Sequence, residues 1–270
     1  MGIVNVTPDS FSDGGRHNIS RAAIAHARLL LDEGAQVLDI GGESTRPGAA
    51  PVSPHHEWIR IQEVLAEALT WGVPISVDTR RTEVMAQALA MGVDIINDVQ
   101  ALQAPGATAL LAAQGRAGVC LMHMRGEPDS MHEQTDYGGD VVRAVGQWLA
   151  HRAATVQAQG VAAERITVDP GIGFAKTPEQ NLTLLQRQRE LLCIGRPLLI
   201  GWSRKSTLGR ITGRPAQERT AASVAAALLA AQAGASVLRV HDVAATVDAL
   251  RVWKAAKDSA PCDAGGPPHR

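Results

Sequence analysis

The chain has 270 residues, which is at the upper end of what one domain can bury around a single core. Its 26 basic and 27 acidic residues give a formal net charge of −1, so no overall field would hold nucleic acid or an anionic membrane surface. No apolar run approaches the roughly 20 residues that span a bilayer, and the three cysteines are far apart, as is typical of free thiols in a reducing cytoplasm.

Short apolar runs rich in β-branched residues alternate along the chain with longer segments of helical periodicity. The runs predict strands over 2–6, 36–40, 74–78, 94–98, 118–123, 165–169, 197–201 and 236–240. The intervening segments predict helices over 20–34, 54–71, 80–91, 105–114, 140–159, 178–191, 217–233 and 242–256. This α/β alternation favours a single (β/α)8 TIM barrel, although an open doubly wound sheet stays possible because periodicity does not show closure.

The barrel domain is predicted over residues 1–257, and the Pro- and Gly-rich segment 258–270 is predicted to be a disordered tail. In a barrel of this kind the active site lies at the C-terminal ends of the strands. The residues at those ends are therefore the first candidates for chemistry. They are mostly polar: Asn5, Asp39, Asp78, Asn97, Asp98, His123, Asp169 and Arg239, with His241 just beyond.

Polar groups at the ends of apolar strands cost free energy unless they are paired or bind a ligand. Asp39 and Asp98 could equally cap the following helices or act in a site. Asp78, Asn97 and Asp169 together favour a site, because the barrel would place them around one cavity. His123 is interpreted as structural, and the other histidines have no metal-ligand spacing.

A ring of two carboxylates, a carboxamide and Lys205 would offer both acceptors and donors, which suits a flat heterocycle with a 2-amino-4-oxo-pyrimidine edge. An imine-forming lysine is expected in an apolar setting. Lys205 follows "GWSR" and lies among polar residues, which favours a hydrogen-bond donor over an imine former. Arg239 and His241 complement an anion, and the oxygen of Asn5 could hold Mg²⁺ beside phosphate. The turns over 39–48 and 169–174 carry glycines but match no nucleotide fingerprint.

The motifs "GIVNVTPDSFSDGG", "DIGGESTRPGA", "SVDT", "IINDV", "LMHMRG", "DPGIGFAKT", "GWSRKS" and "RVHDV" occur in order over about residues 2–246. In this order they resemble the dihydropteroate synthase family of pterin-binding barrels. The resemblance implies a transferase of folate biosynthesis that joins 6-hydroxymethyl-7,8-dihydropterin pyrophosphate to p-aminobenzoate. The products would be 7,8-dihydropteroate and pyrophosphate.

The resemblance also implies the site residues. The pterin would be bound by Asp78, Asn97, Met122, Asp169, Gly201, Lys205 and Arg239. The diphosphate would be bound by Asn5, Arg239 and His241. The p-aminobenzoate or sulfonamide pocket would be formed by Phe11, Thr45, Arg46, Pro47, Phe174 and Ser206.

The catalytic residues implied are Asp78, Lys205 and Asn5, and Asn5 would be the ligand of the Mg²⁺ cofactor. An SN1-like route is expected, because pyrophosphate is a good leaving group and the dihydropterin delocalises the cation that remains. A cytoplasmic enzyme without nucleic-acid or membrane partners is expected. The small, apolar helix over 217–233 predicts a homodimer, and sulfonamides are expected to compete with p-aminobenzoate.

Two other functions fit part of the pattern. A folate-dependent methyltransferase domain would also hold a pterin between strand-end Asp and Asn residues, but it would need neither the diphosphate loop nor "SRKS". A non-catalytic pterin-binding paralogue should have lost one of the polar residues, and none is missing. Family members usually carry a segment before the first strand, so we expect its absence here to affect stability more than chemistry.

Overall fold

The computed structural model describes residues 1–7, 16–44, 51–126 and 131–259. All eight predicted strands are present, each slightly shorter than its apolar run. They are β1 (Gly2–Asn5), β2 (Leu38–Gly41), β3 (Ile75–Asp78), β4 (Ile95–Asp98), β5 (Gly118–Met122), β6 (Ile166–Asp169), β7 (Leu199–Ile200) and β8 (Val237–Leu238). The polar residue that ends the apolar run therefore stands at or next to the end of the strand.

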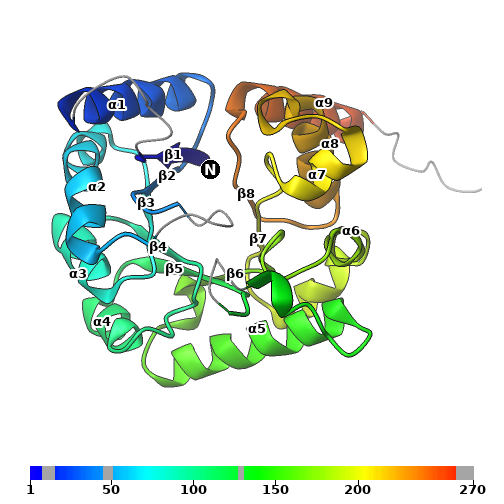
Figure 1. Cartoon of the computed structure of the whole chain (residues 1–270), viewed down its shortest axis with the longest axis horizontal. Helices are drawn as coiled ribbons and strands as arrows, with labels where there is room; N and C mark the ends of the chain where they lie inside the picture. Colours follow the sequence, from blue (N-terminus) through cyan, green and yellow to red (C-terminus); the bar gives the residue numbers. More distant parts are fainter. Residues whose placement is uncertain (8–15, 45–50, 127–130, 260–270) are drawn as a thin grey trace, which may run out of the picture.

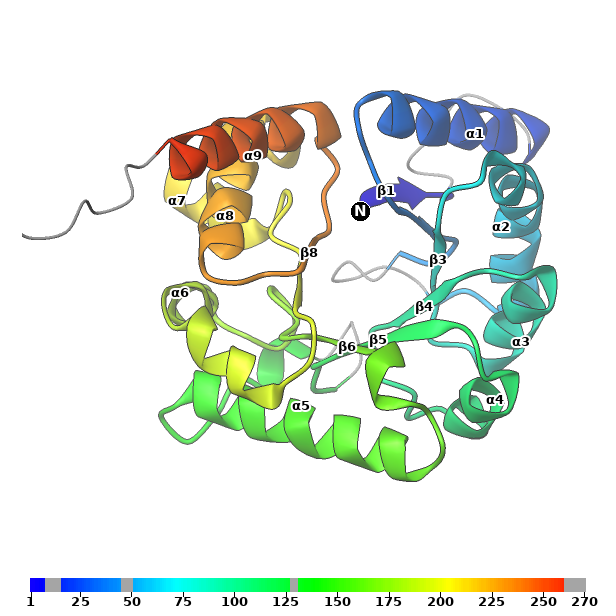
Figure 2. The same ribbon diagram turned by 180° about the vertical axis from the view of Figure 1, so that it is seen from behind.

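The strands form a closed ring, which excludes the open doubly wound sheet. β1 to β6 pair in sequence order as parallel neighbours, and β7 pairs with β8. Isolated parallel bridges join Val168 to Leu198 and Gly2 to Val240, so β6 meets the chain before β7, and the chain after β8 returns to β1. Figures 1 and 2 show the ring of helices that surrounds these strands. The predicted TIM barrel is confirmed.

The helices that cover the barrel are α1 (Arg16–Asp32), α2 (Pro54–Ala68), α3 (Thr82–Met91), α4 (Ala107–Gln114), α5 (Val141–Ala158), α6 (Pro178–Gln186), α7 (Ser206–Thr212), α8 (Thr220–Gln232) and α9 (Val243–Asp258). Several helix bounds differ from the prediction, and the predicted helices over 54–71 and 217–233 each include a 3-10 turn. The segment predicted as one helix over 178–191 is divided into α6 and the 3-10 helix η5 (Gln188–Ile194), where the Arg187 guanidinium pairs with Asp140 and Glu190. The segment after "SRKS" forms the short α7.

Sequence features account for the ends of these helices. Thr177 and Gln180 form a capping box at the start of α6, with a proline at its first position. Gly92 adopts φ +98° after α3 and Gly160 adopts φ +102° after α5, a conformation that other residues rarely adopt. The chain can therefore reverse direction from each helix into the next strand.

A continuous apolar core fills the space between strands and helices. Its strand residues include Val4, Ile40, Val77, Ile96 and Val168, each with at most 2% of its surface exposed. None of the described helices is long and apolar enough to cross a membrane. Asp258, where the predicted tail begins, is the last residue of α9. Residues 260–270 lie outside the described part of the chain, so the disordered tail stays a prediction.

Candidate active site

Strand register brings several of the predicted site residues to one level at the carboxyl end of the barrel. Asn5 is the register partner of Gly41, Gly41 of Asp78, and Asp78 of Asn97, so these four residues lie side by side across β1 to β4. On the next pair of strands Met122 is the partner of Asp169. Because parallel strands end at the same face, the register gathers these residues around one opening.

Arg239, which follows β8, is the centre of a buried polar cluster. Its Nε donates to Asp39 Oδ2 at 2.5 Å, and its Nη2 donates to Asp78 Oδ2 at 2.6 Å. Asn97 Nδ2 donates to the same Asp39 oxygen at 3.1 Å. Strands far apart in the sequence thus meet through one guanidinium, and Asp78 is held in place before any ligand arrives.

Burial governs the charges in this cluster. It raises the pKa of Asp78, and the nearby Asp39 and Asp98 carboxylates act in the same direction, while the Arg239 guanidinium opposes them. Burial also raises the pKa of Asp169, against the Gly171 N–H and the lysines around it. Both carboxyls therefore depend on neighbouring cations to remain ionised.

The two aspartates that could have been helix caps have different roles. Asp98 accepts from the N–H groups of Gln100 and Leu102, so it shapes the turn after β4. Asp39 does not cap α2, which is capped by Ser53. Asp39 is fully buried and holds Arg239 and Asn97, so its role is to position two of the predicted pterin-binding residues.

Lys205 and Phe174 lie together on the other side of the opening. The Lys205 ammonium is 4.1 Å from the centre of the Phe174 ring, a cation–π contact. Phe174 and Met122 belong to one small apolar cluster, which also contains Val99, Met124, Met131 and Ala175. Ser206 is exposed at the first position of α7, directly after Lys205. Residues assigned to the pterin slot and to the p-aminobenzoate pocket are therefore contiguous.

The predicted anion-binding residues Asn5, Arg239 and His241 are half-buried; Asn5 ends β1, and the other two follow β8. Gly201 follows β7, and the Arg239 N–H beside it donates to Ile200 O. His241 Nδ1 lies 2.9 Å from Ser203 Oγ, and the His241 N–H also donates to that hydroxyl. Asn5, at the end of β1, is half-buried as well. The side chains of Asn5 and His241 are therefore close to the surface of the opening.

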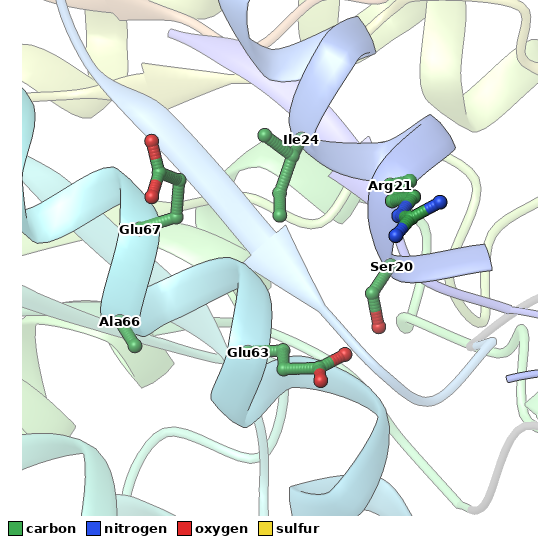
Figure 3. Close-up of a pocket in the computed structure, with 6 residues that line it drawn as sticks. All are labelled: Ser20, Arg21, Ile24, Glu63, Ala66 and Glu67. Carbon is green, nitrogen blue, oxygen red and sulfur yellow. The ribbon is translucent and has the colours of Figure 1, made fainter. Parts of the chain in front are cut away.

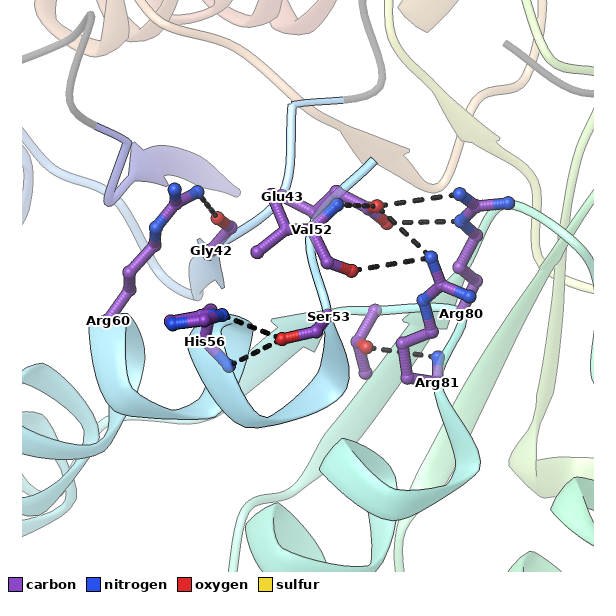
Figure 4. A network of polar contacts seen from close by, with 9 residues as sticks. Gly42, Glu43, Val52, Ser53, His56, Arg60, Arg80 and Arg81 are labelled. Carbon is purple, nitrogen blue, oxygen red and sulfur yellow. Dashed lines mark hydrogen bonds and ion pairs between the residues drawn. The ribbon is translucent and has the colours of Figure 1, made fainter. Parts of the chain in front are cut away.

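Phe11, Thr45, Arg46 and Pro47 lie outside the described residues, but the base of the second of their two loops is described. The Glu43 carboxylate accepts from the Val52 N–H at 3.0 Å and from Arg80 Nε at 3.0 Å, and Arg81 adds a contact at 3.3 Å (Figure 4). Although burial opposes it, the hydrogen bonds from Arg80 and Val52 lower the pKa of Glu43. The two ends of the 44–51 segment are thus joined by one ionised carboxylate.

No group of three or more His, Cys, Asp or Glu side chains in the described part of the chain could hold a metal ion by itself. A single protein oxygen still suits Mg²⁺, because this ion commonly binds one or two protein oxygens together with substrate phosphates and water. Asn5 offers such an oxygen at the rim. The residues therefore fit a metal that arrives with a phosphorylated ligand.

A pocket of about 430 Å³ lies on the outer ring of helices between α1 and α2 (Figure 3). It is lined by Ser20, Arg21, Ile24, Glu63, Ala66 and Glu67. It shares no residue with the cluster at the strand ends. We therefore place the candidate active site at the carboxyl end of the barrel.

The sequence profile of the family described as pterin binding enzyme matches residues 1–241. The chain belongs to this family. Dihydropteroate synthase from Neisseria meningitidis serogroup C is 56% identical over 259 residues, covering 94% of this chain and 91% of the relative. This degree of identity places the chain among the dihydropteroate synthases of the pterin-binding family, as the motifs indicated.

Solved structures of dihydropteroate synthases have the same fold. Xanthomonas albilineans dihydropteroate synthase with 4-aminobenzoic acid superposes with a TM-score of 0.90 at 49% identity, covering 97% of this chain and 93% of the other. The Yersinia pestis dihydropteroate synthase in a sulfonamide complex gives a TM-score of 0.90 at 43% identity, with 96% and 94% covered. Similarity at this level confirms the fold of this pterin-binding enzyme over nearly its whole length.

Sequence reasoning missed two buried ionisable residues near the site. Lys176 lies in the loop after β6, with its ammonium against His123, and Glu57 lies on the inner face of α2. Neither residue stands at a strand end. The sequence contains one indication of Lys176, a charged side chain within the motif "FAKT". A lysine on the surface would look the same in the sequence.

Proposed function

We propose that this member of the dihydropteroate synthase family condenses 6-hydroxymethyl-7,8-dihydropterin pyrophosphate with p-aminobenzoate. The products are 7,8-dihydropteroate and pyrophosphate, in the pathway of folate biosynthesis. The observation that carries the proposal is the ring of Asp78, Asn97, Asp169 and Lys205 at one opening, beside the Arg239 guanidinium. Relatives solved with 4-aminobenzoic acid and with a sulfonamide support the second substrate.

The pterin ring edge pairs with groups of matching hydrogen-bonding type. Asp169 accepts from the 2-amino group and N3–H, Asn97 meets the same edge, and Lys205 donates to the 4-oxo group and N5. Met122 and Gly201 line the slot, and the Arg239 guanidinium stacks on the ring. Phe174 and Ser206, with Phe11, Thr45, Arg46 and Pro47 from the two loops, form the pocket for p-aminobenzoate.

The diphosphate is bound by Asn5, Arg239 and His241, and Asn5 is the protein ligand of Mg²⁺. When bound, the metal withdraws charge from the departing pyrophosphate. Arg239 has a second consequence in this arrangement. Its Nη2 donates to the Asp78 carboxylate, so the same guanidinium links the diphosphate-binding residues to the pterin-binding residues.

The reaction follows an SN1-like route. The bond from the pterin methylene carbon to the diphosphate oxygen breaks first, and the electron pair leaves with pyrophosphate. Asp78 stabilises the resulting cation, which the dihydropterin ring delocalises. The uncharged amine of p-aminobenzoate then attacks the carbon and loses its proton, so binding and orientation supply most of the rate enhancement.

The function is tested by pyrophosphate release with both substrates and Mg²⁺ present. Release that depends on p-aminobenzoate supports the proposal and separates it from a folate-dependent methyltransferase domain, which has no diphosphate to release. Pterin binding without turnover would instead identify a non-catalytic paralogue. Competition by a sulfonamide against p-aminobenzoate in the same assay examines the second pocket.

Asp169→Asn and Asp78→Asn are expected to separate binding from chemistry. Asp169→Asn places a mixed donor and acceptor against two donors, so pterin binding should weaken by about 1–3 kcal/mol. Asp78→Asn removes a charge that matters most when the cation forms, so turnover should fall more than pterin affinity. Calorimetry and steady-state kinetics check this pair; the reverse pattern would exchange the two roles.

We also propose that the enzyme is a homodimer that acts in the cytoplasm. The inner face of α8 packs on the barrel through Ser223, Ala226, Ala227 and Ala230. Its outer face exposes 52% of Leu229, and the adjacent α7 and α9 expose Ile211 and Val252 by 59% and 71%. Exposed apolar side chains on three neighbouring helices suit contact with a second copy of the chain. The free thiols of Cys120 and Cys193 fit a reducing compartment.

Leu229→Glu is expected to convert the dimer into a monomer, because it places a charge in the centre of the proposed apolar interface. Leu29→Glu on α1 is a matched control, since Leu29 is also 52% exposed. Light scattering at micromolar concentration measures the mass of each variant. A monomeric mass for the unmodified chain, or dissociation by both substitutions alike, would count against this interface.

A further inference from the structure

Lys176 is a buried cation that lies beneath the candidate site. Only 6% of the residue is exposed. Its ammonium donates to the carbonyl oxygens of Gly171 at 3.0 Å and Phe174 at 2.9 Å, and it lies 3.1 Å from His123 Nδ1. An ammonium has three donors, so these contacts satisfy all of them. Burial lowers the pKa of His123 to about 2, so its imidazole is neutral and can accept from Lys176.

The loop around this ammonium is tightly curled. Gly171 and Gly173 adopt φ values of +69° and +81°, and Ala175 adopts φ +50°, which is uncommon for a residue other than glycine. A Cβ at Gly171 would collide with the carbonyl oxygen of His123, so the loop packs directly on the end of β5. Lys176 offsets the strain by binding the carbonyl groups that the curl turns inward.

One end of this loop determines the environment of Asp169. The Gly171 N–H donates to Asp169 Oδ1 at 2.7 Å, so the position of the loop fixes that carboxylate. Burial raises the pKa of Asp169, whereas the Gly171 N–H and the cations Lys205, Lys176 and Arg239 favour its ionised form. Lys176 therefore acts on Asp169 both through the loop and through its charge.

The other end of the loop determines the position of Phe174. The carbonyl group of Phe174 is bound by Lys176, and its ring lies against the Lys205 ammonium. A change at Lys176 would thus reach both substrate pockets without direct contact between Lys176 and either substrate.

We propose that Lys176 is a positioning residue of the reaction: its ammonium holds the carbonyl groups of the 170–176 loop, and through the Gly171 N–H this loop holds the Asp169 carboxylate for the pterin ring edge. The proposal rests on the role of Asp169 given under the proposed function. The charged groups that face Asp169 are Lys205, Lys176 and Arg239, and the buried Cys120 thiol beside it is neutral because burial raises its pKa. Burial lowers the pKa of Lys176 to about 7; the Asp169 carboxylate opposes this shift, and Lys205 and Arg125 add to it. Lys176 therefore carries its charge below about pH 7, the range in which Asp169 takes up its proton.

The charge effect has a definite sign. A cation beside Asp169 lowers the pKa of its carboxyl, so removing that cation raises it. Pterin binding needs ionised Asp169, so affinity falls as the pH is lowered; we call this fall the acid limb. Without the cation, the acid limb should lie at a higher pH. A purely structural lysine would change affinity at every pH without moving this acid limb.

The experiment measures the affinity of the full chain for pterin, 2-amino-4-oxopteridine, by fluorescence titration between pH 5 and pH 7.5. Lys176→Met should bind pterin about tenfold more weakly at pH 6, where Lys176 is charged, and should shift the acid limb toward neutral pH. Lys176→Gln keeps two donors for the loop but lacks the charge, so it should show the same shift and carries the test if Lys176→Met does not fold. In the enzyme assay kcat/KM for the pterin substrate should fall more than kcat.

Two control variants separate charge from loop packing. Tyr137→Phe removes the hydrogen bond from Tyr137 Oη to Ala175 O, at 2.9 Å in the same loop, without changing charge, so its acid limb should stay in place. Lys254→Met on the exposed side of α9 should behave as the unmodified chain. An unshifted limb in both Lys176 variants, or an equal shift in Tyr137→Phe, would overturn the proposal. Failure of the unmodified chain to bind pterin would instead overturn the proposed function.

Discussion

Replacing Asp39 by alanine is expected to lower the free energy of unfolding by about 3–5 kcal/mol and to remove most of the activity. Asp39 is fully buried and is the acceptor for both Arg239 Nε and Asn97 Nδ2. Without it the guanidinium loses one of its two hydrogen-bonded carboxylates and keeps Asp78, and the Asn97 amide loses its acceptor. Breaking a buried pair in this way costs far more than losing an exposed one.

Urea denaturation and pyrophosphate release measure the two effects. The matched control is Asp248→Ala, because Asp248 and Arg251 form a pair whose side chains are 74% and 75% exposed. That substitution should change stability by no more than about 0.5 kcal/mol. Asp39→Asn keeps the shape and removes the charge, so its activity should fall although its stability falls less. Similar stabilities for Asp39→Ala and Asp248→Ala would show that Arg239 finds another arrangement.

The sequence predicted the barrel because each strand is a short β-branched run and each helix begins and ends with recognisable residues. It could not show the closure of the ring, which depends on the bridge between Gly2 and Val240 at opposite ends of the chain. The break after α6 was also missed, since periodicity continues through it. There the decisive partner of Arg187 is Asp140, 47 residues away.

The candidate site was predictable as far as polar residues at strand ends were concerned. Asp78, Asn97 and Asp169 stand together as that pattern implies. The role of Asp39 could not be decided, because its partner Arg239 is 200 residues away and a helix cap has the same local sequence. The strand-end pattern could not identify Lys176, because this residue lies in the loop after β6. The curled conformation of that loop buries the Lys176 ammonium.

Glu57→Gln is expected to stabilise the protein at pH 8 by about 3 kcal/mol and at pH 5 by less than about 1 kcal/mol. Glu57 lies on the inner face of α2 with no exposed surface. Burial raises its pKa from 4.5 to about 7, and the carboxylates of Glu43 and Asp78 add to the effect, while Thr79 and Arg81 oppose it. Its pKa is therefore raised in the folded state relative to the unfolded chain.

The sign of the pH dependence follows from this difference. Below pH 4.5 the carboxyl is protonated in both states and costs nothing. As the pH rises toward 7 the unfolded chain loses the proton first, so the folded state becomes progressively less stable, and above pH 7 the full difference applies. Glutamine keeps the shape and stays neutral, so it removes this loss. Urea denaturation at pH 5 and pH 8 measures the effect, with the substitution Glu164→Gln at an exposed position as the matched control.

The position of Glu57 gives this titration a consequence for the site. A Cβ at Gly42 would lie 2.8 Å from the Glu57 carbonyl oxygen, so the start of α2 packs directly beneath Gly42 and Glu43. Glu43 in turn joins the two ends of the 44–51 segment (Figure 4). A charge that develops at Glu57 repels the Glu43 carboxylate and weakens its contacts with Arg80 and Val52. If Glu57→Gln instead lowered stability equally at pH 5 and pH 8, Glu57 would be an ionised partner that this network requires.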